Sequence, residues 1–266
     1  MFIGEVAVSV DHSPVASPGL MRWVYGDFAK VEAIGWLWSQ LFIDKFRRER
    51  LDVMSLHGPT GDFDVKRTIR DRMKSFVIKR LMLNTHDAIR LVETNRIPRV
   101  LVHLPEARKN RKELLRTHKT IAVENDITLK DGVGETAIFV RDLTMARGNK
   151  KTEMVVDLGH FAQSRGLVND PNTAVEEALR LIEIIQREYK IKISLHIPFN
   201  CGGDDGGLDY TKVSLPNIKR IFEFENVIEN QIDSPLRWVN PFYLIGYKKR
   251  TRMLMDWIWV AKNTIN

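Results

Sequence analysis

Six short apolar runs in this chain each end in a residue that can bind a metal ion or move a proton. The end residues are His57, His103, Glu124, Asp157, His196 and Glu225. Imidazole and carboxylate groups together bind divalent ions such as zinc, manganese, iron and cobalt, and a carboxylate can also act as a general acid or base. The pattern therefore predicts metal-assisted chemistry, acid–base chemistry, or both.

Buried parallel strands are the elements that would bring these side chains together. The apolar runs cover residues 52–57, 100–103, 121–124, 154–157, 193–196 and 221–225. Most intervals between them have helical patterns, and helices are predicted over 27–50, 64–95 with a break near Asn84, 107–118, 135–147 and 173–189. Strands that alternate with helices indicate an α/β protein with a parallel sheet.

The alternation predicts one (β/α)8 TIM barrel that spans residues 1–266 as a single domain. A first strand is predicted over residues 2–10. For the one strand still missing, either Trp23-Val24-Tyr25 forms a short strand or the barrel is incomplete. Because the C-terminal ends of barrel strands lie on one face, where barrel enzymes keep their active sites, we expect the six end residues to face one cavity.

Local details of the runs suit a barrel interior with a metal site at its mouth. Small residues such as Ser55, Ala122 and Ser194 precede the end residues by two positions and share their face. His160 follows Asp157 after a glycine turn and can reach the same mouth. Unpaired acids are costly to bury. Two acids and a histidine from separate strands could therefore hold one divalent ion (Mn, Zn, Co or Fe) and leave positions open for substrate.

Composition and charge exclude some classes of protein. The 266 residues include 41 Lys and Arg against 34 Asp and Glu, a net charge of +7, and the basic clusters near residues 45–50, 108–112 and 248–252 are interpreted as solvated faces. A single cysteine, Cys201, excludes an intrachain disulfide and suits the reducing cytoplasm. The start of the chain lacks a secretory signal pattern, and the apolar stretch 31–43 is too short to span a bilayer. We expect a cytoplasmic protein without a membrane partner.

The ordered series of motifs resembles the xylose-isomerase-like TIM barrel superfamily. This superfamily includes sugar isomerases and epimerases and the endonuclease IV type of apurinic-site nuclease (AP endonuclease family 2). The resemblance runs from about residue 3 to 230 and is carried by Leu56-His57-Gly58-Pro59, Val102-His103, Val123-Glu124-Asn125, the stretch from Val156-Asp157 to His160-Phe161-Ala162, Leu195-His196 and Phe224-Glu225-Asn226.

The resemblance implies a role for each of these residues. Glu124, Asp157, His196 and Glu225 match the single-metal site of the sugar epimerases, in which Glu124 and Glu225 would also be the catalytic acid/base pair. His160 matches a substrate-binding histidine. His57 and His103 match positions that hold a further zinc in the nuclease branch, so they are candidates for a second metal or for substrate.

Three functions follow from this reading. The first is an enzyme, a metal-dependent isomerase or epimerase with a small sugar or polyol substrate. The second is an endonuclease IV-type phosphodiesterase acting on abasic DNA. It is weakened because residues 200–210 lack the Asp-x-His pair of that branch, and we expect at most weak nucleic-acid binding. The third is a non-catalytic binding barrel with a vestigial metal site.

Overall fold

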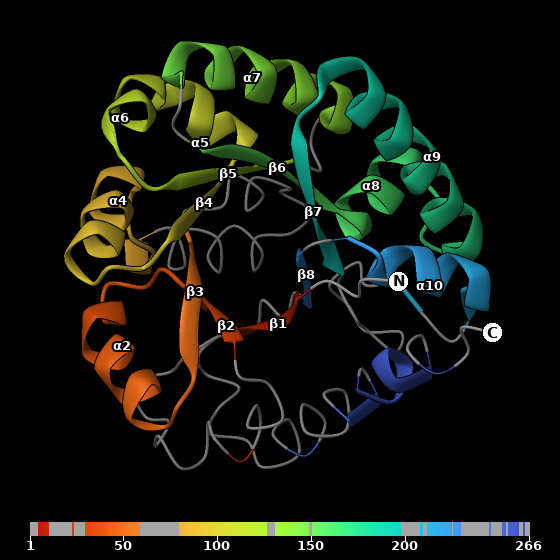
Figure 1. Ribbon diagram of the computed structural model, residues 1–266, viewed down its shortest axis with the longest axis horizontal. Coiled ribbons are helices and arrows are strands. Elements are labelled where there is room, and N and C mark those ends of the chain that lie inside the picture. The colour runs from red at the N-terminus through yellow and green to blue at the C-terminus, as the bar shows by residue number, and fades with distance from the viewer. Residues whose placement is uncertain are drawn as a thin grey trace, which may run out of the picture.

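A computed structural model describes the backbone of most of the barrel, and its strands close into a ring in chain order. The described residues are 5–10, 23, 30–58, 80–126, 131–148, 151–197, 208–209, 212–224, 226–229, 245, 252–253, 255–260 and 263. All eight strands are parallel, and β1 pairs with β8 as well as with β2. Figure 1 looks down the barrel with the helices outside the ring of strands. The predicted (β/α)8 barrel is confirmed.

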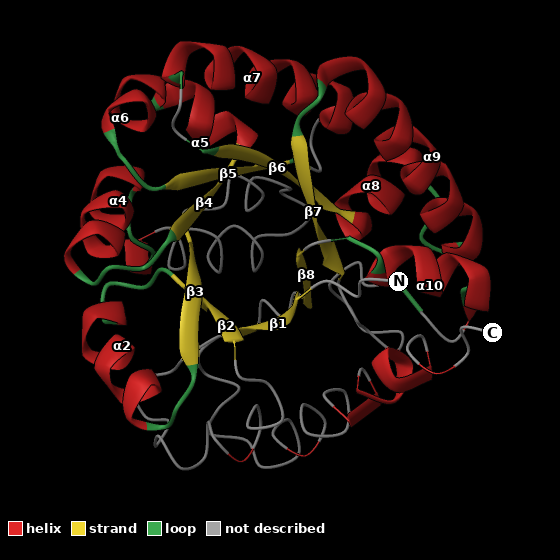
Figure 2. Ribbon diagram, viewed as in Figure 1, coloured by secondary structure: helices red, strands yellow, loops and turns green. Residues whose placement is uncertain are grey.

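The strands and helices alternate along the chain (Figure 2). The strands are β1 Glu5–Val10, β2 Lys30–Ile34, β3 Asp52–His57, β4 Arg99–His103, β5 Thr120–Glu124, β6 Thr152–Asp157, β7 Lys192–Ile197 and β8 Asn226–Glu229. The helices are α2 Ser39–Arg48, α4 Thr85–Thr94, α5 Leu104–Lys109, α6 Arg111–Arg116, α7 Gly132–Arg147, α8 Leu158–Arg165, α9 Pro171–Tyr189 and α10 Leu215–Phe222. Within the described ranges, every helix is too short or too polar to cross a lipid bilayer.

The strand that sequence patterns left unassigned is β2, inside the region predicted as a helix. The helix prediction over 27–50 is wrong at its start, because Lys30–Ile34 is a strand and α2 begins only at Ser39. Val31 and Ala33 are buried in the core between barrel and helices, whereas Glu32 contacts residues inside the barrel. Trp23 is helical, and Val24 and Tyr25 lie outside the described residues. The eighth strand therefore exists, and β2 supplies it.

The strand predicted over 221–225 is also wrong. Ile218, Ile221 and Phe222 are buried at helical spacing on one face of α10. β8 begins at Asn226, whose Cα pairs with that of Glu5 in β1. Glu225 itself lies outside the described residues. The apolar pattern was correctly recognised as buried, but its period of three to four residues belongs to a helix.

The other predicted helices are present with shifted ends. Asn84, where a break was predicted, precedes α4 and its side chain accepts a hydrogen bond from Asp87 N at 2.9 Å. The remainder of the helix predicted over 64–95 lies mostly outside the described residues. The region 107–118 holds parts of two short helices, α5 and α6, which meet at Asn110.

The barrel interior has an apolar layer beneath its polar mouth. Leu101, Ala122 and Val155 form a fully buried cluster of their own, separate from the apolar core outside the barrel. Ser194 pairs with Val155 across β6 and β7. Side chains alternate along a strand, so the residue two positions after each member of this layer also faces inward. In β4 to β7 that residue is the last or next-to-last of the strand. The fold thereby aims the ends of β4 to β7 into one cavity.

Candidate metal centre at the barrel mouth

Glu124, the last residue of β5, is the centre of a buried polar cluster. Its Oε1 lies 2.9 Å from His196 Nδ1, and its Oε2 lies 3.1 Å from His103 Nε2 and 3.3 Å from His57 Nε2. All four side chains are fully buried. The residues come from β3, β4, β5 and β7, so a single carboxylate contacts imidazoles from three other strands. The sequence prediction that these strand ends converge is confirmed for these residues.

Asp157 lies on the same cluster and also begins the next helix. Its Oδ1 accepts a hydrogen bond from His160 N at 2.8 Å, as an N-cap does, and its own N–H donates to Asn125 Oδ1 at 2.7 Å. Asp157, Glu124 and His196 each offer a ligand atom, and the three atoms lie within 4.8 Å of one another. The backbone at the β6–α8 junction is thus fixed from both sides, which holds the carboxylate at the mouth.

The hydrogen bond of His57 determines which ring nitrogen faces Glu124. His57 Nδ1 lies 3.0 Å from the carbonyl oxygen of Gly58, which can only accept, so Nδ1 carries the hydrogen. A neutral His57 then turns the Nε2 lone pair toward Glu124 Oε2, the oxygen that also lies 3.1 Å from His103 Nε2. Two acceptors that face each other at 3.3 Å repel unless a proton or a metal cation lies between them.

The residue that follows the end of β3, Gly58, has to be a glycine. Its N–H donates to the Leu101 carbonyl oxygen at 2.7 Å, and a Cβ at this position would lie 2.7 Å from the same oxygen. Only glycine allows β3 to approach β4 this closely. The glycine after His57 therefore serves to place its own carbonyl oxygen against the His57 ring.

His160 is the polar group of the cluster that is partly accessible to solvent. Its Nδ1 donates to the carbonyl oxygen of Asn125 at 3.0 Å, and its ring lies 5.5 Å from that of His103. With the hydrogen on Nδ1, the neutral ring offers Nε2 as an acceptor. The predicted return of this histidine to the mouth is confirmed, and its exposure suits contact with a small molecule.

Electrostatics hold the cluster in charged form. Burial alone would raise the pKa of the Glu124 carboxyl, but the charges of His196 and His103 and their hydrogen bonds keep that pKa well below 4.5. Burial would lower the pKa of His196, yet Glu124 and Glu32 raise it to about 10. In the absence of metal, His196 is therefore an imidazolium between carboxylates.

Glu32 is the site residue that sequence analysis missed. It is fully buried on β2, with Oε1 at 3.3 Å from His196 Nε2 and Oε2 at 3.6 Å from Arg99 Nη1. Burial would raise the pKa of Glu32, but His196, His57 and Arg99 lower it to about 2. The alternation of Lys30-Val-Glu-Ala-Ile34 was the signal that could have revealed it, because this pattern has period two.

A second set of buried charges lies at the other end of the interior. Arg99 Nε pairs with Glu153 Oε1, and Glu153 Oε2 lies 3.8 Å from Lys192 Nζ. Arg99 and Lys192 thus balance Glu32 and Glu153. Glu124 and Asp157 lie at the mouth, where the other members of their ligand groups are histidines.

The residues at the mouth fit a divalent ion. Among the described residues, three overlapping groups have ligand atoms within 4.8 Å of one another, namely Glu124 with Asp157 and His196, Glu124 with His57 and His103, and Glu32 with His57 and His196. The donors are imidazole nitrogens and carboxylate oxygens, the set that zinc, manganese, iron and cobalt accept. Two carboxylates match the charge of one such ion. A cation would also relieve the repulsion between the lone pairs of His57 Nε2 and Glu124 Oε2.

The structure does not test the fourth predicted ligand, Glu225. Glu225 lies outside the described residues, and it comes one residue before β8, whereas the other predicted ligands each lie at or next to the end of a strand. The carboxylate residue that ends β8 is Glu229, whose Cα pairs with Ile197 and with Val8. The ligand role of Glu225 remains a prediction.

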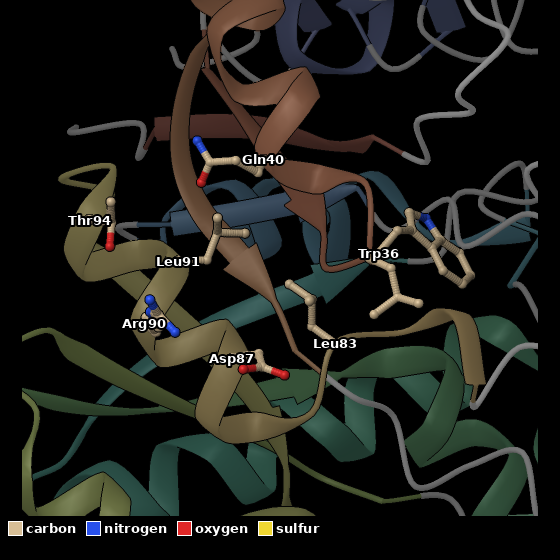
Figure 3. Close-up of a pocket in the computed structure, with 8 residues that line it drawn as sticks. Trp36, Gln40, Leu83, Asp87, Arg90, Leu91 and Thr94 are labelled. Carbon is tan, nitrogen blue, oxygen red and sulfur yellow. The ribbon is translucent and has the colours of Figure 1, made fainter.

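A cavity on the flank of the barrel is separate from this centre. It has a volume of about 280 Å³ and lies between α2 and α4, where Trp36, Gln40, Leu83, Asp87 and Leu91 are among its lining residues (Figure 3). None of the cluster residues lines it. It has no group of ligand-type side chains like that at the mouth.

Solved structures share this architecture. A candidate xylose isomerase from Rhodospirillum rubrum ATCC 11170 aligns over 95% of this chain and 99% of its own, with a TM-score of 0.57 and 13% identity. The fold is that of the xylose-isomerase-like barrels. A xylose isomerase domain protein from Planctomyces limnophilus (TM-score 0.53, 11% identity, 99% and 98% coverage) shares this xylose-isomerase-like barrel.

An epimerase has the same barrel. The D-allulose 3-epimerase from Methylomonas sp. aligns over 97% of this chain and 98% of its own, with a TM-score of 0.53 and 12% identity. No protein-family model and no curated protein matches the sequence. At these identities the xylose-isomerase-like likeness establishes the fold.

Proposed function

We propose that this chain is a metal-dependent isomerase or epimerase that acts on a small sugar or polyol. The observation that carries the proposal is the fully buried group of Glu124, Asp157 and His196, whose ligand atoms lie within 4.8 Å of one another at the strand ends of a closed barrel. Burial of several acids and imidazoles costs folding free energy unless they are paired or bind a metal. A catalytic metal centre would account for their burial.

The neighbouring structures support the choice of substrate class. One structure of the Methylomonas D-allulose 3-epimerase contains D-allulose, and it aligns with 96% of this chain at a TM-score of 0.51. We infer the same general chemistry here, in which a proton leaves the carbon beside a carbonyl and returns to the same or a neighbouring carbon. When bound, a divalent ion supplies polarisation of the substrate oxygens, which makes that carbon acidic.

Separate residues of the chain would transfer the proton, orient the base and bind the substrate. Glu124, a ligand candidate, is also the proposed base, since its pKa is held low and it remains a carboxylate at neutral pH. His57 and His103 contact the second oxygen of that carboxylate and orient it. His160, the partly accessible ring, would accept a hydrogen bond from a substrate hydroxyl through Nε2. The complete burial of Glu124, His57 and His103 keeps bulk water away from the reacting carbon.

A second carboxylate is needed to return the proton. The resemblance to the sugar epimerases assigns this role to Glu225. The variant Glu225→Gln tests the assignment, because an amide has nearly the shape of the acid but cannot transfer the proton. A loss of exchange with metal retained would identify Glu225 as the partner of Glu124, and unchanged exchange would reject it.

Proton exchange with solvent tests the proposal directly. Wild-type protein loaded with Mn²⁺, Co²⁺ or Zn²⁺ is expected to incorporate deuterium from heavy water into at least one member of a panel of ketoses, aldoses and keto-inositols. Glu124→Gln is expected to reduce the rate by about 100- to 10,000-fold, the usual contribution of a general acid or base. Metal content must be measured on the same samples. Absence of exchange on every compound with metal bound would refute the isomerase function.

One observation favours a second candidate, an endonuclease IV-type phosphodiesterase. His57, His103 and Glu124 form a ligand group of their own, which would hold a further ion beside the first. Against this, residues 200–210 contain no histidine. Cleavage of an abasic duplex together with two or more bound ions per chain would favour the nuclease. Bound metal without sugar exchange or DNA cleavage would instead favour a non-catalytic barrel.

A further inference from the structure

His196 lies between two buried carboxylates, one on each ring nitrogen. Nδ1 lies 2.9 Å from Glu124 Oε1, and Nε2 lies 3.3 Å from Glu32 Oε1. We propose that Glu32 is a positioning residue that keeps the hydrogen of His196 on Nε2 and so presents Nδ1 to the metal held by Glu124 and Asp157. This inference rests on the metal centre of the proposed function.

The placement of the two nitrogens supports the assignment. A histidine that binds a metal through one nitrogen usually donates its other N–H to a carboxylate or carbonyl, which fixes the tautomer and the ring orientation. Glu32 comes from β2 and lies on the Nε2 side, whereas Glu124 lies on the Nδ1 side and shares a ligand group with Asp157. An ionised carboxylate can only accept, so Glu32 keeps the hydrogen on Nε2.

Arg99 keeps Glu32 available for this role. Arg99 Nη1 lies 3.6 Å from Glu32 Oε2, and Arg99 Nε pairs with Glu153. Among the described residues, Glu32 makes ion-pair contacts with Arg99 and His196 and has no further hydrogen bond. Because a guanidinium retains its charge at any physiological pH, one Glu32 oxygen is occupied by Arg99 and the other faces His196. The contacts therefore form a chain from Glu153 through Arg99 and Glu32 to His196.

The alternative is that Glu32 binds the metal itself. Glu32, His57 and His196 also have ligand atoms within 4.8 Å of one another. In that arrangement the ion would bind Nε2 of His196, and Arg99 would lie next to a metal ligand with its positive charge directed at the ion. The charge balance argues against it, since Arg99 already neutralises Glu32, whereas the ion-pair contacts of Glu124 are with histidines.

The informative variant is Glu32→Gln, with Glu153→Gln as its matched control. Both remove one buried charge that contacts Arg99, but only Glu32 contacts His196. The glutamine at position 32 has a single oxygen, and the charged Arg99 takes it, so the NH₂ group turns toward His196 Nε2. A donor there favours a hydrogen on Nδ1 and opposes metal binding at that atom.

Two measurements on the full chain test the inference. Chelator competition with Zn²⁺ is expected to show a loss of affinity of about 10- to 100-fold in Glu32→Gln, the usual effect of removing an outer partner of a metal-binding histidine, and less than about 3-fold in Glu153→Gln. Nitrogen-15 NMR of the imidazoles is expected to show zinc on Nδ1 of His196 in the wild type. In metal-free protein, the Nε2 resonance of His196 should shift in Glu32→Gln and not in Glu153→Gln.

The outcomes distinguish this inference from the proposed function. If the wild type binds zinc but on His196 Nε2, or if Glu32→Gln binds zinc as tightly as the wild type, the positioning role is overturned while the metal centre stands. If the wild type binds no metal, the proposed function fails, and the metal-free Nε2 resonance still decides whether Glu32 orients the ring. Equal losses of affinity in both variants would reduce Glu32 to a structural member of the Arg99 network and would also overturn the inference.

Discussion

Glu124 Oε1 lies 2.9 Å from His196 Nδ1, although the two residues are 72 positions apart in the chain. The contact crosses from β5 to β7 past β6, whose last residue, Asp157, contributes to the same ligand group. A carboxylate and an imidazole at this distance, both fully buried, either share a proton or bind a cation together.

Removal of Asp157 is expected to remove the metal. Asp157→Ala should reduce bound zinc or manganese at least about tenfold, as measured by elemental analysis after dialysis, because it deletes one ligand of the group. The substitution also removes the N-cap of α8, which costs about 1 kcal/mol of stability. Asp170→Ala is the matched control, since Asp170 caps α9 and lies in no ligand group. Equal metal in all three proteins would contradict the assignment.

His160 is expected to affect substrate rather than metal. His160→Ala should raise KM about tenfold, the value of one lost hydrogen bond to substrate, on whichever sugar shows exchange. Bound metal should change little, because His160 belongs to none of the ligand groups. A loss of metal in this variant, with KM unchanged in the fraction that retains metal, would show that the ring is a ligand instead.

The stability of the metal-free protein should fall as pH rises from about 6.5 to 10. The pKa of His196 is raised from 6.5 to about 10 in the folded protein, so its stabilisation is complete below pH 6.5 and is lost as the pH approaches 10. One proton corresponds to at most about 1.4 kcal/mol per pH unit, or roughly 3–6 °C in Tm for a domain of this size.

A metal-loaded sample provides the comparison for this pH series. Metal must displace the hydrogen from one nitrogen of His196, so metal binding strengthens with pH and the loaded protein should show the opposite slope at fixed total zinc. Thermal melts with chelator and with excess zinc measure both. Parallel slopes would show that His196 does not exchange its proton for metal.

Loss of Arg99 should be far more destabilising than loss of Lys192, although both contact Glu153. Arg99→Leu leaves two buried carboxylates, Glu32 and Glu153, without their main partner, and breaking a buried pair from one side costs about 3–5 kcal/mol. The Lys192 side chain is 44% exposed, and Lys192→Leu should cost at most about 1 kcal/mol. Urea unfolding of both variants measures the difference. Similar costs would show that the Arg99 contacts are not a structural requirement.

Local sequence pattern determined most of the barrel and most of its site. The short apolar runs that end at Glu124, Asp157 and His196 were sufficient to predict strands, because helical patterns separate them along the chain. Because parallel strands share one direction, their ends had to meet. The convergence of His57, His103 and His160 followed from the same argument and is confirmed.

The tertiary structure decided where the ring closes. Only residues 35–38, which are mostly apolar, separate β2 from α2, so local sequence pattern predicted one continuous helix. The apolar last turn of α10 was likewise predicted as a strand. What makes Lys30–Ile34 a strand is pairing with β1 and β3, with a register shift between Val31 and Glu32. That pairing turns Glu32 inward, onto His196 and Arg99. These contacts join residues far apart in the chain, so no local sequence pattern predicts them. They become visible only in the closed barrel.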